Sequence, residues 1–372
     1  MFGLTVERSA RPDPSRSAHL TGATRTTSTE QMPDTTPRTI HDLPTPALVV
    51  ERSVFEANTA AMDAVHPGTR LRPHVKAFKS TAMAKVLHAA GHTGFCCATP
   101  REVEGMVAAG LGDDLLLANE SLDVARLGAL ADQANITVAV DSDATLDAAI
   151  AGGIRSVLID VDIGLPRCGC DLGDAGRLAG RARSAGLDVR GVMGYEGHLM
   201  MIEDRVARAD KVARSTDKLL QAAADVGGDI VSGGGTGTFD VNTACTEIQA
   251  GSYTLMDTDY AKLDLPFEIA INLLGTVISV SPKGWVIADT GLKSHGMDHG
   301  KPTWEHGEVF IVSDEHVTLR PTEPRKSTDW KVGDRVRLLP AHVDPTVAKH
   351  EQMWVVDGDD VVDCWPIDLR HW

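Results

Sequence analysis

The sequence predicts an α/β protein, with a (β/α)8 TIM-type barrel followed by a C-terminal all-β domain. Two observations carry this prediction. Between about residues 71 and 254, short apolar β-type runs alternate with helical patterns rich in Ala and Leu. From about residue 272, short β-like runs are instead separated by turns that contain Gly, Asp and Pro. Alternation of strand and helix is typical of a parallel sheet, whereas closely spaced short strands are typical of an all-β domain.

The N-terminal segment differs from the rest of the chain. Residues 1–38 are rich in Arg, Ser, Thr and Pro and lack apolar periodicity, so we expect a disordered tail. A targeting peptide can have the same composition, and Met32 would suit a later start of translation, so these alternatives stay open. Order is expected from about Pro44, with a strand at 47–50 and a helix from Ser53 to about Val65.

The barrel is predicted over residues 39–268, and the β domain over 269–372. The expected barrel strands are the β-type runs at 71–76, 94–97, 114–118, 136–140, 156–161, 190–194, 229–232 and 247–254. Helical patterns lie between most of them, at 80–90, 100–109, 121–133, 143–151, 171–186 and 203–226. The alternative is an open doubly wound sheet. The β domain is predicted from runs at 274–280, 285–289, 307–312, 335–339 and 353–357.

Composition narrows the class of partner. Of the 372 residues, 42% are apolar, which is enough for a sizeable core. The formal net charge of −16 argues against nucleic acid and anionic membranes, and favours a small-molecule substrate. No apolar run approaches the length of a membrane span. The six cysteines form no C-x-x-C pair and no secreted framework, so we expect a cytoplasmic protein.

Two stretches together indicate a cofactor. Lys76 ends the first barrel run, where a lysine faces the mouth of the barrel and can form a Schiff base. The glycine-rich stretch 233–238 follows the seventh run and offers backbone N–H groups and the hydroxyls of Thr236 and Thr238 to a phosphate. Either feature alone is common on ordinary surfaces and turns. On one rim they fit a cofactor with an aldehyde and a phosphate, pyridoxal 5′-phosphate (PLP). A second set of donors is expected at Gly251, Ser252 and Tyr253.

Other candidates fall on the same rim. Arg167 follows the fifth run and can meet a phenolate or carboxylate, and Tyr195 ends the sixth and can bond a pyridine ring. His198, three residues further on, is a candidate base. In the β domain, His342 and Asp344 stand at i and i+2, which on a strand point the same way and can bind one metal ion. Carboxylate and imidazole ligands favour Mn²⁺ or Mg²⁺, with Zn²⁺ possible.

These motifs resemble those of a known family. The stretches TPALVV, RPHVKAFKS, CATPREVEGMVAAG, DLLLANE, VDIGLPRCG, GYEGH, SGGGTGT, QAGSYTLMD, IADTGLKS and HVDPT run in order from about residue 44 to 368. Together they are similar to the D-threonine aldolase and D-serine dehydratase family, PLP enzymes related to alanine racemase. The resemblance implies that Lys76 binds PLP, as the lysine of a P-H-x-K motif that includes His74. It also implies that relatives form homodimers.

The resemblance assigns the remaining roles too. It implies that Arg167 and Tyr195 touch the cofactor ring and that His342 and Asp344 hold the metal ion. It implies that the phosphate is held by Gly235, Thr236, Gly237 and Thr238 together with Gly251, Ser252 and Tyr253. Two departures stand out: Phe78 occupies the place of a histidine, and Met201 stands where some aldolases carry another. The base is therefore either His198 or a hydroxide on the metal ion.

The expected function is a metal-assisted, PLP-dependent aldolase that cleaves a D-3-hydroxy-amino acid, such as D-threonine, to glycine and an aldehyde. One alternative is a dehydratase acting on D-serine or 3-hydroxyaspartate. In the family, dehydratases tend to carry H-x-C and aldolases H-x-D, so Asp344 favours the aldolase. An amino-acid racemase is a less favoured alternative, because its reaction does not need a pair of metal ligands. A non-catalytic PLP-binding protein is another, but it would need only the barrel and not the β domain with its H-x-D pair.

Overall fold

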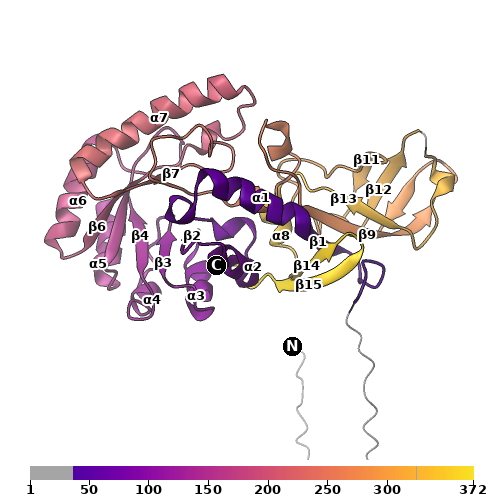
Figure 1. The fold of residues 1–372 in the computed structure, drawn as a ribbon, viewed down its shortest axis with the longest axis horizontal. Coiled ribbons are helices and arrows are strands. Elements are labelled where there is room, and N and C mark those ends of the chain that lie inside the picture. The colour runs from indigo at the N-terminus through magenta and orange to yellow at the C-terminus, as the bar shows by residue number, and fades with distance from the viewer. Residues whose placement is uncertain (1–36, 324) are drawn as a thin grey trace, which may run out of the picture. The chain divides into compact units, whose positions relative to one another are not determined.

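The computed structural model describes residues 37–323 and 325–372, and Figure 1 shows their arrangement. The predicted tail lies outside the described residues, except for its last two positions. The barrel and the β-rich domain are both confirmed, and their described residues form one compact unit. The structure corrects the prediction for the runs at 47–50 and 71–76 and for the lengths of two later elements.

The barrel contains a seven-stranded parallel sheet whose strands follow one another in chain order. They are β2 (Gly94–Cys97), β3 (Asp114–Leu117), β4 (Ile136–Val140), β5 (Ser156–Asp160), β6 (Asp188–Met193), β7 (Ile230–Gly233) and β8 (Glu247–Ile248). Each begins within two residues of its predicted start. The predicted eighth strand is shorter than expected, because Ser252–Thr254 forms a 3₁₀ turn instead.

The segment 71–74 closes this sheet into a barrel. Leu71 forms a parallel bridge to Ile248 of β8, and His74 forms one to Cys96 of β2. We predicted a regular strand at 71–76. The pairing is sparse because Pro73 has no N–H to donate, and the chain then turns into the 3₁₀ helix Val75–Ala77. Lys76 therefore lies in a turn just past the barrel wall.

Alternation along the barrel strands separates two cores. One set of side chains forms a small cluster of buried residues, Cys96, Leu116, Ala139, Leu158 and Met193. Their neighbours on the same strands, such as Leu115 and Leu117, join the large apolar core. This is the inside and outside of a closed parallel sheet.

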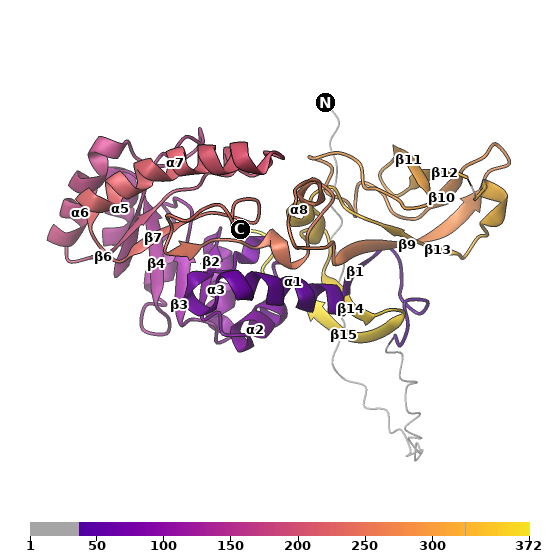
Figure 2. The same cartoon turned by 45° about the horizontal axis from the view of Figure 1, so that its top comes forward.

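Helices follow the barrel strands, and α6 and α7 pack against β5 and β6 (Figure 2). The α-helices of the described residues up to 226 are α1 (Arg52–Val65), which precedes the first barrel strand, and α2 (Thr81–Ala89), α3 (Pro100–Ala108), α4 (Ala125–Gly128), α5 (Asp143–Ala151), α6 (Ala175–Ser184) and α7 (Arg205–Val226). The predicted helix 121–133 is reduced to the four residues of α4. Among the described residues, none of these helices is long and apolar enough to cross a membrane.

The second domain is built on an eight-stranded sheet in the order β11-β12-β10-β9-β1-β14-β15, with β13 also paired to β9. Its strands are β1 (Ala47–Glu51), β9 (Ile271–Val280), β10 (Val286–Ala288), β11 (Gly307–Val312), β12 (Val317–Pro321), β13 (Arg335–Leu338), β14 (Gln352–Asp357) and β15 (Asp360–Pro366). One short helix, α8 (Val343–Val347), interrupts them.

Strand β1 belongs to this second sheet, although we expected residues 39–268 to form the barrel. It pairs in parallel with β14 and antiparallel with β9, and the indigo strand lies between them in Figure 1. Leu48 and Val50 face the large core, whereas Ala47 and Val49 pack with Leu274 in a separate cluster. A strand that is apolar on both faces must be covered on both faces, and these two clusters cover the two faces of β1.

Candidate active site

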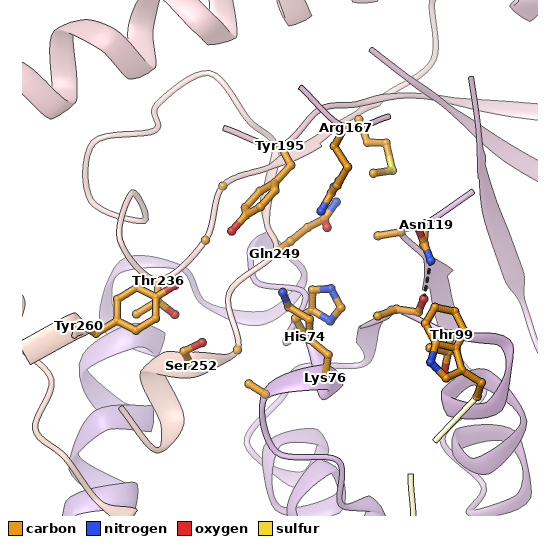
Figure 3. A pocket seen from close by; sticks show the side chains of 18 residues that line it. His74, Lys76, Thr99, Asn119, Arg167, Tyr195, Thr236, Gln249, Ser252 and Tyr260 are labelled. Atoms are coloured by element: carbon orange, nitrogen blue, oxygen red, sulfur yellow. Dashed lines mark hydrogen bonds between the residues drawn. The ribbon is translucent and has the colours of Figure 1, made fainter. Parts of the chain in front are cut away.

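A cavity of about 220 Å³ opens at the carboxyl ends of the barrel strands. In Figure 3, Arg167 and Tyr195 lie at one side of it, and His74 and Lys76 at the other. Eight of the predicted cofactor residues line this cavity: His74, Lys76, Arg167, Tyr195, Gly235, Thr236, Gly251 and Ser252. They come from the closing segment and from the loops after β5, β6, β7 and β8, so parallel strands bring them to one rim.

Lys76 is placed to react within this cavity. Its side chain is 40% exposed, and its Nζ lies 3.7 Å from Oδ2 of Asp344. The Asp344 carboxylate raises the pKa of the Lys76 ammonium, while burial opposes that change. The neighbouring His74 is buried, and burial holds its pKa well below the usual value, so its ring is neutral. Its Nδ1 has no hydrogen-bond partner among the described residues.

Arg167 and Tyr195 form a pair opposite the lysine. The Arg167 guanidinium lies 5.4 Å from the centroid of the Tyr195 ring. Burial raises the pKa of the Tyr195 phenol, so the group is a hydrogen-bond donor at neutral pH. Arg167 is carried by a loop that depends on Gly169, whose φ is +110°, and a Cβ there would come within 2.4 Å of the Asp162 nitrogen. The pair therefore offers a fixed cation and a hydroxyl to a bound group.

Two glycines in the cavity lining are closely packed against the protein behind them, so the wall there is bare backbone. A Cβ on Gly251 would come within 2.3 Å of the His74 carbonyl oxygen, so no side chain fits at that position. A Cβ on Gly235 would meet the Met200 side chain at 3.0 Å. The hydroxyls of Thr236 and Ser252 lie beside these glycines, and Thr236 accepts a hydrogen bond from the Tyr253 amide at 2.9 Å. These residues form one end of the cavity.

Three predicted phosphate residues do not line the cavity. The Thr238 hydroxyl donates to the buried carboxylate of Glu196 at 2.8 Å. Glu196 also accepts hydrogen bonds from the Gly234 amide and from the Asn242 side chain, so its buried carboxylate holds the glycine-rich loop in place. Gly237 packs against the Met200 backbone, and Tyr253 is fully buried against Phe267. Gly237, Thr238 and Tyr253 therefore support the conformation of the loops around the cavity and do not line it.

His198 is the candidate base that the structure places elsewhere. It lies in the 3₁₀ turn Gly197–Leu199, with an exposed side chain that does not line the cavity. Its ring faces Gly164, where a Cβ would meet the imidazole at 3.1 Å. The turn directs position 198 away from the cavity, whereas Tyr195 points into it.

The residues of the predicted metal pair do not lie on a strand. His342 is the N-cap of α8, and Asp344 lies in that helix's first turn. Pro345 explains the difference, because proline is well tolerated in the first turn of a helix. The prediction that His342 and Asp344 alternate along a strand is therefore wrong, although Asp344 does reach Lys76 of the cavity. Its other oxygen, Oδ1, is buried without a partner among the described residues.

His342 belongs to a small group of metal-type donors. Its Nδ1 lies 2.6 Å from Oδ2 of Asp298, and its ring stacks on that of His299 with centroids 3.9 Å apart. One donor atom each from Asp298, His299 and His342 lie within 4.8 Å of one another. Sequence reasoning missed Asp298 and His299, which follow the IADTGLKS stretch in a loop with no recognisable spacing to His342.

Comparison with known proteins agrees with this arrangement. Residues 50–259 match the model of the alanine racemase N-terminal domain, and residues 270–356 match that of a putative serine dehydratase domain. A D-threonine aldolase of Arthrobacter sp. is 36% identical over 354 residues, covering 88% of this chain and 92% of the relative. The chain belongs to the D-threonine aldolase family.

Solved structures support the same grouping. A D-threonine aldolase from Filomicrobium marinum superposes with a TM-score of 0.83 at 31% identity, over 90% of this chain and 97% of the other. A D-threo-3-hydroxyaspartate dehydratase from Delftia sp. HT23 gives a TM-score of 0.80 at 25% identity, over 90% of this chain and all of the other. This D-threonine aldolase family member is accordingly a PLP-dependent lyase with the alanine racemase-like fold.

The residues of the cavity fit PLP. The cavity of this family member is lined by the side chain of Lys76 and by bare backbone at Gly235 and Gly251, and His74 there has an unpartnered buried nitrogen among the described residues. The cavity also contains residues that the sequence did not single out: Thr99, Asn119, Gln249, Tyr260 and Trp372. Thr99 and Asn119 follow β2 and β3, so their position at strand ends was a usable signal.

Proposed function

We propose that this chain is an aldolase that cleaves a D-3-hydroxy-amino acid, such as D-threonine, to glycine and an aldehyde, using PLP and one divalent metal ion. The observation that carries the proposal is the approach of Asp344 to Lys76, at 3.7 Å from Oδ2 to Nζ. It brings the acid of the H-x-D motif to the lysine of the cofactor cavity. The cofactor on the lysine and the metal ion on the acid would then both be within reach of one small substrate.

Each part of the cavity has a role in this proposal. Lys76 would bind the cofactor aldehyde, and Gly235, Thr236, Gly251 and Ser252 would hold its phosphate. Arg167 and Tyr195 would contact the cofactor ring, and His74 would offer its unpartnered Nδ1. Bound PLP supplies an electron sink for the bond that breaks at the substrate's α-carbon.

The metal ion is proposed to lie at His342 and Asp344. The Asp298 carboxylate holds a proton on His342 Nδ1, which leaves Nε2 free as a ligand. A carboxylate and an imidazole suit Mn²⁺ or Mg²⁺, and Zn²⁺ is the third candidate. A divalent ion there would lower the pKa of a substrate hydroxyl. The Lys76 amine, which lies beside Asp344, could accept the proton that leaves this hydroxyl and return it to the α-carbon of the product, so that the protons balance.

Two further features belong to the proposal. We propose that the protein acts in the cytoplasm, which is supported by six free cysteines and no secreted framework. We also propose that it forms a homodimer, as the family resemblance implies. Its partner is then a small molecule together with a second copy of the same chain.

The test is product identification with and without metal. Purified protein is incubated with D-threonine, D-serine and the 3-hydroxyaspartate isomers, with Mn²⁺ or after chelation. We expect glycine and an aldehyde from D-threonine, no cleavage after chelation, and recovery with Mn²⁺ or Mg²⁺. The visible absorption of bound PLP should survive chelation. A keto acid and ammonia as the main products would contradict the aldolase and favour the dehydratase.

A further inference from the structure

Lys79 is a second lysine close to the cavity, and it has an unusual backbone conformation. Its φ is +51°, a left-handed value that is uncommon for a residue other than glycine. Its amide donates to the Val75 carbonyl at 2.7 Å, which tightens the turn that carries Lys76. Lys79 is half-buried and does not line the cofactor cavity. The contacts of its ammonium therefore have to be sought outside the cavity lining.

The contacts of the ammonium join two distant parts of the chain. Lys79 Nζ donates to the backbone carbonyl of Lys76 and, at 3.0 Å, to the backbone carbonyl of Asp344. Lys76 lies in the turn after the segment that closes the barrel, whereas Asp344 lies in the first turn of α8. Helix α8 packs on that turn. Hydrogen bonds from a charged donor are stronger than neutral ones, so this bridge resists separation of the two segments.

Both acceptors belong to residues whose side chains face each other. A carbonyl is rigidly connected to its own Cα, so holding the two carbonyls also restrains the positions of the Lys76 and Asp344 side chains. The Nζ to Oδ2 distance between those side chains is 3.7 Å. Without the Lys79 bridge, the packing of α8 on the turn would lack the hydrogen bonds that tie the Lys76 carbonyl to the Asp344 carbonyl.

We propose that Lys79 is a positioning residue that sets the spacing between the cofactor-binding lysine and the metal-binding carboxylate. This inference rests on the proposed function for the roles of Lys76 and Asp344. It assigns Lys79 to the geometry of the site, not to a chemical step.

The experiment compares three variants with the parent. Lys79→Met removes the ammonium but keeps an unbranched side chain, and Lys79→Arg keeps a charged donor. Lys85→Met is the matched control, because Lys85 is an exposed residue of α2. For each protein, the dissociation constants of PLP and of Mn²⁺ are measured separately by absorption and calorimetry, alongside kcat and KM.

For Lys79→Met we expect the Mn²⁺ dissociation constant to rise about tenfold or more, as for loss of an outer partner of a metal ligand. PLP binding should change less than about twofold, and kcat should fall more than KM rises. Lys79→Arg should recover part of the Mn²⁺ affinity, and Lys85→Met should match the parent. A folded Lys79→Met that binds Mn²⁺ as tightly as the parent would overturn the inference.

Two further outcomes are decisive. If Lys79→Met does not fold, Lys79→Gln decides, because it removes the charge but keeps a polar side chain: weakened Mn²⁺ binding with intact PLP binding supports the role, and parental values for both overturn it. If the parent binds PLP but neither Mn²⁺ nor substrate, the proposed function fails. Crystal structures then test the spacing alone, because the Lys76 and Asp344 Cα atoms should lie farther apart in Lys79→Met, and an unchanged separation would refute the inference.

Discussion

The Nζ atom of Lys76 lies 3.7 Å from Oδ2 of Asp344, although the first residue belongs to the barrel and the second to the β-rich domain. The contact sits at the cavity, where Lys76 is 40% exposed and Asp344 is 18% exposed. Neither domain alone contains both groups. The reaction proposed above needs the lysine and the acid together, so the junction between the domains makes the site.

Replacing Lys76 by Ala should remove the visible absorption of bound PLP and nearly all turnover, because the cavity then lacks the amine that we propose bonds the cofactor. Absorption spectra and product formation are compared for the parent and for Lys85→Ala, which alters an exposed lysine of α2. If Lys79→Ala lost the absorption and Lys76→Ala retained it, the assignment of the lysine would be wrong.

Replacing Gly235 by Val should raise the PLP dissociation constant by at least about tenfold, or about 1.4 kcal/mol. A Cβ at this position already meets Met200 at 3.0 Å and Tyr195 at 3.5 Å, so a branched side chain would displace these neighbours, of which Tyr195 lines the cavity. The matched control is Gly173→Val, because a Cβ on Gly173 meets no atom within 4 Å. Equal PLP affinity in the two variants would argue against a cofactor cradle at Gly235.

Replacing Asp298 by Ala should weaken Mn²⁺ binding by about tenfold to a hundredfold, because His342 loses the carboxylate that fixes its ring. The absorption of bound PLP should not change. Calorimetric titration with Mn²⁺ measures the effect, and Asp314→Ala serves as the control at an exposed carboxylate of the same domain. Parental Mn²⁺ affinity in Asp298→Ala would remove Asp298 from the metal site.

Asp160, at the end of β5, should make stability depend on pH. Burial, reinforced by the Glu120 carboxylate, raises the pKa of Asp160 well above its usual value. The folded protein keeps this proton to higher pH than the unfolded chain. The contribution of Asp160 to the free energy of unfolding is therefore full below the ordinary carboxyl pKa, and it is lost as pH rises through the raised pKa.

The variant Asp160→Asn removes this titration. Its melting temperature relative to the parent should increase between about pH 5 and about pH 8, since only the parent must bury a charge at the higher pH. Asp171→Asn, at an exposed carboxylate nearby, should follow the parent at every pH. A constant difference between Asp160→Asn and the parent would show that Asp160 titrates normally in the folded protein.

Much of the barrel was predictable from local pattern. The strands β2 and β4 have the predicted bounds because a buried parallel strand is a continuous apolar run between turn residues. Lys76, Arg167 and Tyr195 could be placed on one rim because the carboxyl ends of parallel strands meet at one side of a barrel. Those inferences need only the order of the elements and the direction of each strand.

Other features depended on partners that are distant in the sequence. The run that forms β1 is apolar on both faces, so it reads alike in either domain, and only pairing with β9 and β14 decided its sheet. The hydroxyl of Thr238 was predicted to bind a phosphate, but in the structure it donates its hydrogen bond to Glu196. His198 stands three residues after Tyr195, yet the intervening turn sends its side chain outside the cavity.

The sequence by itself determined which groups are available: a strand-end lysine, a glycine-rich turn and an H-x-D pair. These groups can be recognised in the sequence because each motif is a short stretch of the chain and its chemistry follows from the types of its residues. Only the tertiary structure decided that Asp344 faces Lys76, that Asp298 holds His342, and that Lys79 joins the backbones of Lys76 and Asp344. The physical reason is that each of these contacts joins segments that are distant in the chain and are brought together only by tertiary packing. Asp344 meets Lys76 and Lys79 where the barrel packs on the β-rich domain, whereas Asp298 meets His342 within the β-rich domain, and neither kind of packing leaves a local pattern in the chain.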